Sequence, residues 1–200
     1  MGREFELKYR ADAATLEAIR TRFGEFQTIS METVYYDTPD GALGRLHWTL
    51  RRRYENGVSV CTVKTPASNG GRGEWEICCP EITAAVASLV ALGAPEALLS
   101  LAAQGLEPVC GARFTRLAAQ VPVEDTLVEL ALDRGILTGG GRELPFAEVE
   151  VELKCGREAD AVDFARRLAE TFGLVPEPKS KVQRALELRH TGDREHGQSE

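Results

Sequence analysis

Residues 4–9 read EFELKY, so charged and apolar side chains alternate with a period of two. Successive side chains of a β-strand point to opposite faces, so Glu4, Glu6 and Lys8 would share one face. Two carboxylates and an ammonium group in a row can hold a divalent metal ion and bind an anion. Taken alone the pattern is weak evidence, because an antiparallel strand with one solvated face alternates in the same way.

The alternation recurs along the chain, in most of the segments that read as strands. We predict eight strands, near residues 3–10, 31–37, 46–55, 58–65, 73–79, 111–121, 125–137 and 146–155. Acids dominate the polar faces of the first, fifth, seventh and eighth strands, namely Glu4, Glu6, Glu74, Glu76, Glu129, Asp133, Glu148, Glu150 and Glu152. Bases dominate the third, fourth and sixth, namely Arg51, Arg53, Lys64 and Arg116.

Two structures could present these charged faces. A flat sheet lying on helices would expose them as a solvated surface. Eight strands are also enough to close a barrel that holds one small ligand, with the apolar face outward under helices. The segregation of acids from bases favours the barrel, and arginine is preferred where phosphate contacts are bidentate.

A charged barrel interior needs ligands. Two like charges about 4 Å apart repel by about 4 kcal/mol at an intermediate dielectric, so clustered glutamates imply a bound cation or interleaved bases. All-oxygen ligands fit Mg²⁺ or Mn²⁺ rather than Zn²⁺. The bases then require an anion, and the two features together describe a site for a metal ion and a polyphosphate.

Turn and helix signals separate the strands. The segment 55–57, Glu-Asn-Gly, is a strong hairpin signal, and 69–71 and 139–141 mark looser turns. The glycine triplet at 139–141 lacks the lysine and serine of a phosphate-binding loop, so we interpret it as a hairpin tip. Asp12 is placed to cap a helix that carries Leu16, Ile19 and Phe23 on one face.

Further helices are predicted from composition and spacing. The alanine-rich and leucine-rich stretch 82–104 predicts two short helices broken at 93–95. A helix over 158–172 ends at Gly173, and a last one covers 179–189. We expect one domain over 1–189 and a disordered polar tail over 190–200.

Composition excludes several classes of protein. The chain has 200 residues, 43% hydrophobic and 28% charged, with a formal net charge of −7. We therefore expect no nucleic-acid partner and no membrane partner, and no segment reads as a signal peptide or a membrane span. The odd number of cysteines, five, without C-x-x-C spacing, favours small buried hydrophobes in a reducing cytosol over a zinc site or disulfides. We expect a cytoplasmic protein, and a homodimer is one oligomeric state open to it.

The ordered set of motifs resembles the CYTH family, also called triphosphate tunnel metalloenzymes. Glu4-x-Glu6-x-Lys8 is similar to the family signature E-x-E-x-K, and residues 35–39, YYDTP, to its second-strand segment. The remaining matches follow in order and cover about residues 3–188: Leu50-Arg51-x-Arg53, residues 55–57, Lys64, Glu74-x-Glu76, Arg116, Glu129 with Asp133, Glu150-x-Glu152, and Ser180-Lys181 with Arg184.

The resemblance implies an α+β, mainly β, fold: an eight-stranded antiparallel β-barrel tunnel with helices packed on the outside. It also implies Mg²⁺ or Mn²⁺ as cofactor and triphosphates or organic phosphates as substrates. The likeness is greatest to the bacterial inorganic triphosphatase branch, in which the domain is often fused to a helical, histidine-rich CHAD domain, and we expect no such domain here. We therefore expect hydrolysis of inorganic triphosphate, or a short polyphosphate, to pyrophosphate and phosphate.

Residue roles follow from the same resemblance. Phosphate binding would fall to Lys8, Arg51, Arg53, Lys64, Arg116, Lys181 and Arg184. The metal ion would be held by Glu4, Glu6, Glu150 and Glu152. The supporting acids would be Glu74, Glu76, Glu129 and Asp133, which complete the metal shells, orient bases or position the attacking water. Catalysis would depend most directly on Glu4, Glu6, Lys8 and Lys181.

Three alternatives stay open. A relative acting on thiamine triphosphate or a nucleotide, as a triphosphatase or an adenylate cyclase, would need an aromatic platform, for which Trp48, Tyr35 and Trp75 are the candidates, although each is more typical of a core. A module that senses polyphosphate without turnover would use the same charged residues. A structural β-domain with a charged outer face is the third alternative.

Overall fold

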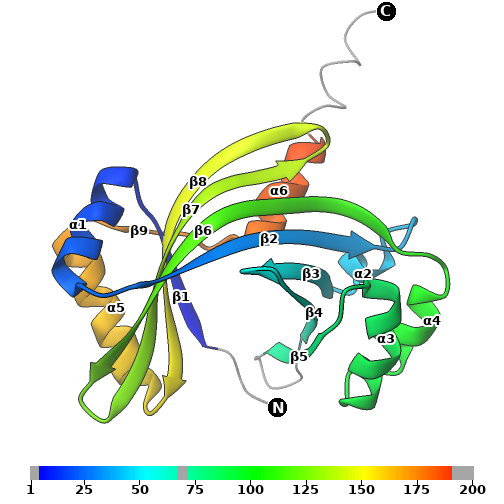
Figure 1. The fold of residues 1–200 in the computed structure, drawn as a ribbon, viewed down its shortest axis with the longest axis horizontal. Helices are drawn as coiled ribbons and strands as arrows, with labels where there is room; N and C mark the ends of the chain where they lie inside the picture. Colours follow the sequence, from blue (N-terminus) through cyan, green and yellow to red (C-terminus); the bar gives the residue numbers. More distant parts are fainter. Residues whose placement is uncertain (1–4, 67–71, 191–200) are drawn as a thin grey trace, which may run out of the picture.

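The computed structural model describes residues 5–66 and 72–190, and Figure 1 shows their arrangement. The strands are β1 (Glu6–Arg10), β2 (Gln27–Asp37), β3 (Thr49–Glu55), β4 (Val58–Pro66), β5 (Arg72–Cys78), β6 (Glu107–Val123), β7 (Thr126–Gly139), β8 (Arg142–Cys155) and β9 (Val175–Pro176). The helices are α1 (Ala13–Phe23), α2 (Ala42–Arg45), α3 (Ile82–Ala91), α4 (Ala97–Ala102), α5 (Glu158–Phe172) and α6 (Lys181–His190).

All nine strands form one antiparallel sheet in the order β5-β4-β3-β2-β6-β7-β8-β1-β9. The predicted mainly β, antiparallel class is confirmed, and the eight predicted strands correspond to β1–β8. The prediction of a closed eight-stranded barrel needs correction. In the described part of the chain, β5 stays at one edge of the sheet, and the two-residue β9 pairs with β1 at the other.

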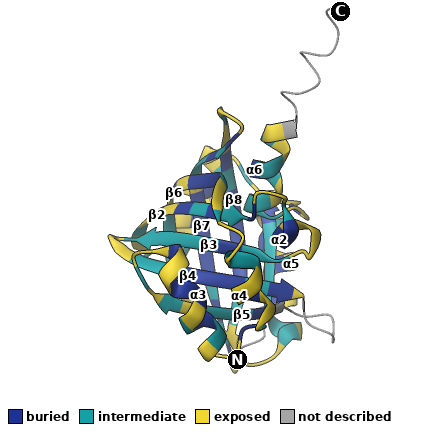
Figure 2. Ribbon diagram, turned by 90° about the vertical axis from the view of Figure 1, so that its right-hand side faces the viewer, coloured by how far each residue is buried: buried dark blue, intermediate teal, exposed yellow. Residues whose placement is uncertain are grey.

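Two pairs of helices cover the apolar face of the sheet, one pair at each end. On β7 and β8, Val128, Leu130 and Val149 point away from the charged face and pack with Ile19 of α1 and Leu168 of α5. On β3 and β4, the residues that alternate with the bases pack under α3 and α4, and Figure 2 shows this buried layer following the strands. Four helices therefore lie on the outside, as predicted.

Helix α6 lies instead on the charged, concave face. Its Val182 and Ala185 pack against Phe114 of β6 and Leu137 of β7, which share the face of the predicted site residues. The close approach depends on Gly139, where a Cβ atom would lie 2.1 Å from the carbonyl oxygen of Ala185. The C-terminal helix thus closes one end of the concave face.

Local signals in the sequence account for most element boundaries. The side chain of Asp12 accepts a hydrogen bond from the Thr15 amide at 2.7 Å and caps α1. Asn56 and Gly57, at φ 50° and 87°, form the turn between β3 and β4. The glycine triplet is the predicted β7–β8 turn, whereas the predicted turn at 69–71, the start of the first strand and the tail at 191–200 lie outside the described residues.

The cysteines follow the prediction in part. Cys61 and Cys110 are buried, and burial raises the pKa of their thiols to about 11 and about 12. Cys78 and Cys155 are exposed, contrary to the prediction of buried hydrophobes, because each is the last residue of its strand. Among the described residues, no helix combines the length and the apolar character needed to cross a bilayer.

Candidate active site

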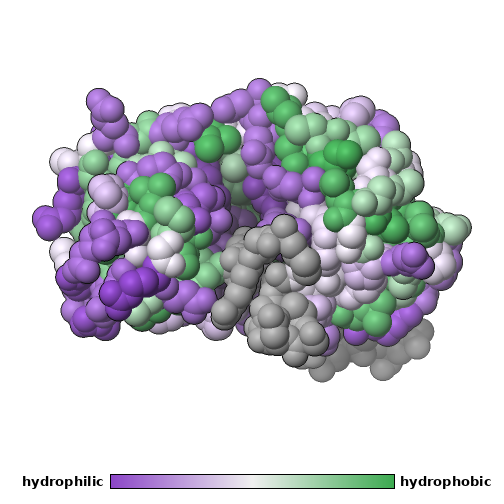
Figure 3. All heavy atoms as spheres, turned by 90° about the horizontal axis from the view of Figure 1, so that it is seen from below, coloured by the Kyte–Doolittle hydropathy of each residue, from purple (hydrophilic) through white to green (hydrophobic). Residues whose placement is uncertain are grey.

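A cavity of about 410 Å³ lies on the concave face, between β3–β5 on one side and β1, β7 and β8 on the other. Figure 3 shows hydrophilic atoms around the hollow between the two halves of the molecule. Its acidic lining residues are Glu6, Glu55, Glu74, Glu76, Glu129, Glu150 and Glu152, and its basic ones are Lys8, Arg51, Arg53, Lys64, Arg116, Lys154 and Lys181. These described charges balance, so a bound polyanion would need accompanying cations.

One wall carries the bases of β3 and β4. Arg51 and Arg53 stand two residues apart on β3, so both point into the cavity. The Nζ atom of Lys64 lies 3.3 Å, and Nη2 of Arg51 3.7 Å, from Oε1 of Glu74. Within the described part of the chain, the buried Nε of Arg51 has no hydrogen-bond partner. Burial, and then the charge of Arg51, lower the pKa of Arg53, so an anion placed between these guanidinium groups would relieve their repulsion.

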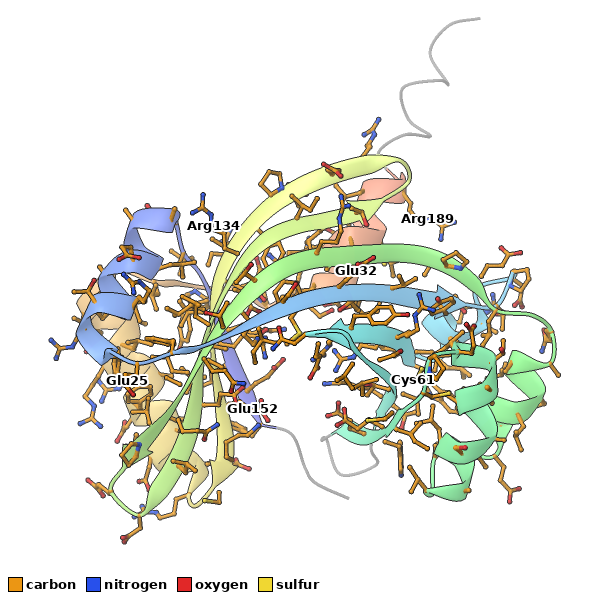
Figure 4. The ribbon with its side chains drawn as sticks, viewed as in Figure 1. Glu25, Glu32, Cys61, Arg134, Glu152 and Arg189 are labelled. Carbon is orange, nitrogen blue, oxygen red and sulfur yellow. The ribbon has the colours of Figure 1, made fainter. Side chains whose placement is uncertain are left out.

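The opposite wall carries a row of glutamates. Glu6 of β1 faces Glu152 of β8, and Glu152 faces Glu129 of β7 in the next strand pair. All three line the cavity, and Figure 4 shows Glu152 on the side of the hollow while Arg134 of β7 lies on the convex side. Carboxylates directly opposite one another destabilise a sheet unless cations lie near them. Lys154 supplies one such cation, with its Nζ 2.9 Å from Oε1 of Glu152.

The floor of the cavity is a buried network of ion pairs. Arg116 of β6 donates through Nε and Nη2 to both oxygens of Asp133, each at 2.8 Å, and also contacts Glu150. Lys181, the first residue of α6, places its Nζ 2.8 Å from Oδ2 of Asp133 and 2.7 Å from Oε1 of Glu150. The same ammonium contacts Glu148, which is fully buried. Residues from three strands and a helix thus meet here.

The network favours the charged forms of Lys181, Glu150 and Arg116, whereas burial raises the pKa of Glu148. Burial alone would lower the pKa of Lys181, but Asp133 and the two glutamates raise it far above its ordinary value. Burial would raise the pKa of Glu150, but Lys181 and Arg116 hold it well below its usual range. For Arg116, Glu150 and Asp133 outweigh burial and raise the pKa further. Two permanent cations therefore face the cavity at neutral pH.

Among the described residues, one group of acids brings its oxygens close enough to hold a metal ion, and a second, more widely spaced group lines the cavity. Asp133, Glu148 and Glu150 have oxygens within 4.8 Å of one another, but the ammonium of Lys181 contacts all three, so in this conformation a cation already neutralises them. The row of Glu6, Glu129 and Glu152 offers only oxygen donors that line the cavity, and this donor chemistry fits Mg²⁺ or Mn²⁺.

Most of the predicted site residues meet in this cavity. Those that line it are Glu6, Lys8, Arg51, Arg53, Lys64, Glu74, Glu76, Arg116, Glu129, Glu150, Glu152 and Lys181. Asp133 lies beneath the surface of the cavity, and its bonds to Arg116 and Lys181 fit the predicted role of orienting bases. Glu4 lies outside the described residues.

Arg184 departs from the prediction. It does not line the cavity, and its guanidinium contacts Glu148 and lies 3.9 Å from Glu177. Lys181 and Arg184 lie three residues apart and share a helix face, but Lys181 lines the cavity and Arg184 does not. We therefore do not retain Arg184 as a direct phosphate ligand.

Other residues that line the cavity are not among the predicted site residues. Glu55 and Lys154 extend the alternation of β3 and β8 by one step, a signal that the strand pattern already contained. Tyr35 and Thr49 also line the cavity, whereas Trp48 and Trp75 pack with the layer under α3 and α4. Of the three aromatic candidates for an organic group, Tyr35 is thus the one at the cavity.

The segment 35–39 has a structural function at its end. Asp37 accepts hydrogen bonds from the Leu43 amide at 2.8 Å and the Gly44 amide at 3.0 Å, and the Thr38 hydroxyl accepts one from Ala42 at 2.7 Å. These bonds hold the first turn of α2, a helix of four residues that sequence periodicity did not reveal. The segment therefore fixes the connection between β2 and β3.

The model of the CYTH domain family matches residues 2–186. The inorganic triphosphatase of Haemophilus influenzae is 28% identical over 166 residues, which is 82% of this chain and 47% of that protein. The chain thus spans about half the length of this curated relative.

Solved structures share the fold. A putative adenylyl cyclase from Hippeastrum with a dominant triphosphatase activity is 18% identical, covers 94% of this chain and 96% of its own, and has a TM-score of 0.66. A protein from Pyrococcus horikoshii is 24% identical, with 93% and 99% covered and a TM-score of 0.64. A putative adenylate cyclase from Bacillus halodurans is 22% identical, with 92% and 98% covered and a TM-score of 0.61.

Proposed function

The chain belongs to the CYTH domain family, and on that premise we propose that it hydrolyses inorganic triphosphate, or a similar short polyphosphate, to pyrophosphate and phosphate with Mg²⁺ or Mn²⁺. The observation that carries the proposal is the cavity of balanced charge, which sets the bases of β3 and β4 against the glutamate row of β1, β7 and β8. The homologous Haemophilus triphosphatase supports this class of hydrolase.

The basic residues would bind the phosphate groups. Arg51, Arg53 and Lys64 approach from one wall, and Lys8, Arg116 and Lys181 from the other. The placement of Arg51 and Arg53 side by side on the cavity wall supports a role in anion binding, because guanidinium groups can bind phosphate oxygens in a bidentate way. Phosphoryl transfer depends on such positioning and charge neutralisation more than on covalent chemistry.

The glutamate row would hold the metal ion. Of the four predicted ligands, Glu6 and Glu152 belong to this row, Glu4 lies outside the described residues and remains a predicted ligand, and Glu150 contacts Lys181 and Arg116. Glu129 joins the row through its register with Glu152. A bound divalent ion supplies charge neutralisation at the phosphate oxygens. Glu74, Glu76 and Asp133 remain supporting acids: Glu74 lies beside Arg51 and Lys64, and Asp133 orients Arg116 and Lys181.

The experiment is a phosphate-release assay with inorganic triphosphate, ATP and thiamine triphosphate, each with Mg²⁺, with Mn²⁺ and without metal. We expect phosphate release from inorganic triphosphate in the metal-containing reactions. Equal consumption of an organic triphosphate would favour the related enzyme with an organic substrate. Tight binding of triphosphate without turnover would replace the enzyme with a polyphosphate-binding module.

A further inference from the structure

Glu148 was counted among the acids of β8 without a role, and its surroundings suggest one. It is fully buried and is not among the residues that line the cavity. Its Oε1 atom accepts a hydrogen bond from Nζ of Lys181, and its Oε2 atom accepts one from Nη2 of Arg184. One carboxylate thus holds two side chains of α6, one on each oxygen.

The two side chains that Glu148 holds lie three residues apart, on one face of the first turn of α6. A contact at a single point would leave the helix free to rotate about its axis, whereas two contacts one turn apart fix both its rotation and its position along the axis. Ser180, Lys181 and Val182 of this turn line the cavity. The orientation of the first turn therefore decides where the ammonium of Lys181 points.

A second buried carboxylate supports Arg184 from the other side. Glu177 is buried, and its Oε2 atom lies 3.9 Å from Nη1 of Arg184 and 3.7 Å from Nε of Arg10 on β1. The backbone ties Glu177 in place, since its amide donates to the carbonyl of Lys8 at 2.9 Å and its side chain accepts from the Lys179 amide at 3.0 Å. Arg184 thus contacts two carboxylates and is not among the described residues that line the cavity.

We infer that Glu148 is a positioning residue that acts through Lys181: by holding Lys181 and Arg184 together, it seats the first turn of α6 and directs the ammonium of Lys181 to the cavity. The inference deepens the proposed function and rests on it for its kinetic readout. It also gives Arg184 a structural reason for its presence beside Lys181 in place of the phosphate contact predicted from sequence.

The decisive experiment is a double-mutant cycle with Glu148→Gln and Lys181→Met, measured as kcat/KM for inorganic triphosphate. We expect Glu148→Gln to lower kcat/KM by about tenfold or more in the wild-type background, and by less than about twofold once Lys181 is absent. A merely structural role would cost the same factor in both backgrounds, and that result would overturn the inference.

Two further variants guard against misfolding and non-specific effects. Glu143→Gln removes an exposed ion-paired glutamate from the same strand, far from the network, and should leave kcat/KM unchanged in both backgrounds. The pair Glu148→Gln with Arg184→Gln leaves no unmatched buried charge, so it should fold if the single variant does not. Its loss of kcat/KM should again disappear when Lys181 is replaced.

A readout without turnover separates this inference from the proposed function. Hydrogen exchange of the α6 amides at 182–186 should speed up in Glu148→Gln and stay at the wild-type rate in Glu143→Gln. If wild-type protein releases no phosphate but exchange in α6 still speeds up in Glu148→Gln alone, the proposed function is wrong and the role of Glu148 in positioning α6 is retained. If exchange in α6 does not change, the positioning role is wrong whatever the activity.

Discussion

The ammonium nitrogen of Lys181 lies 2.7 Å from Oε1 of Glu150, although 31 residues separate them in sequence. Glu150 projects from the middle of β8, and Lys181 begins the helix that closes one end of the concave face. The contact brings a base from the last described helix to the floor of a cavity built by the sheet.

Activity should require a divalent metal ion. Glu6, Glu152 and Glu129 lie directly opposite one another on three neighbouring strands, and a bound polyanion would add further negative charge beside them. Excess EDTA should abolish phosphate release. Glu6→Gln should lower kcat by about 100-fold, or about 2.7 kcal/mol, with little change in melting temperature. Full activity in EDTA, or wild-type turnover by Glu6→Gln with metal present, would show that the row binds no catalytic ion.

The bases of β3 provide an internal comparison. Arg51→Ala and Arg53→Ala should each raise KM and lower kcat, with a combined loss of about 100-fold in kcat/KM, because each removes a charge from the phosphate-binding wall. Arg52→Ala is the matched control: its guanidinium donates to the carbonyl of Pro80 and lies 5.1 Å from the ring of Tyr54, on the opposite face. Equal losses at the three positions in a steady-state assay would contradict the assignment of faces.

Inorganic triphosphate should be preferred over ATP by about tenfold or more in kcat/KM, which corresponds to about 1.4 kcal/mol. The charged side chains of the cavity can bind phosphate and metal. Trp48 and Trp75 are not available to an organic group, because they pack in the layer under α3 and α4. The difference should appear in kcat/KM more than in binding, because ATP can bind through its phosphates in an unproductive register. A competition assay with both substrates measures this preference. Equal consumption would contradict it and would make Tyr35 the candidate contact for the organic group of ATP.

Stability should depend on pH through Glu150. Its pKa is lowered in the folded protein, mainly by Lys181 and Arg116 acting against burial, so its contribution is present above the ordinary value of 4.5 and is lost as pH falls through the lowered folded value. Lys181, whose pKa is raised, contributes fully below its ordinary 10.5 and loses its contribution only above that pH. The contribution of the pair should therefore be constant between about pH 5 and pH 10.

Denaturant unfolding of wild type and Glu150→Gln tests this window. The variant should lose about 3 kcal/mol at pH 7, because Lys181 and Arg116 lose a buried partner. The difference between the two proteins should shrink at pH 3.5, because below the ordinary value of 4.5 the unfolded chain takes up a proton that folded Glu150, with its lowered pKa, does not. A difference that stays the same at both pH values would mean that Glu150 is not charged in the folded protein at pH 7.

Much of this protein could be predicted from its sequence because side-chain direction in a strand is a local property. The alternation around Glu6 and Lys8, and the spacing of Arg51 and Arg53, assigned these residues to one face, and the structure places that face in the cavity. Capping by Asp12 and the turn at Asn56 and Gly57 are equally local, since each depends on a few neighbouring backbone groups.

The tertiary structure decided the features that depend on distant partners. Whether the sheet closes depends on how its edge strands β5 and β9 lie relative to each other, and no residue pattern within either strand determines that. The position of α6 depends on Gly139, because Ala185 packs against the backbone where this residue has no side chain. With α6 in this position, Arg184 donates a hydrogen bond to Glu148. Period-two alternation fixes the face on which a side chain lies, but only the register between strands and the docking of a helix fix which charges meet.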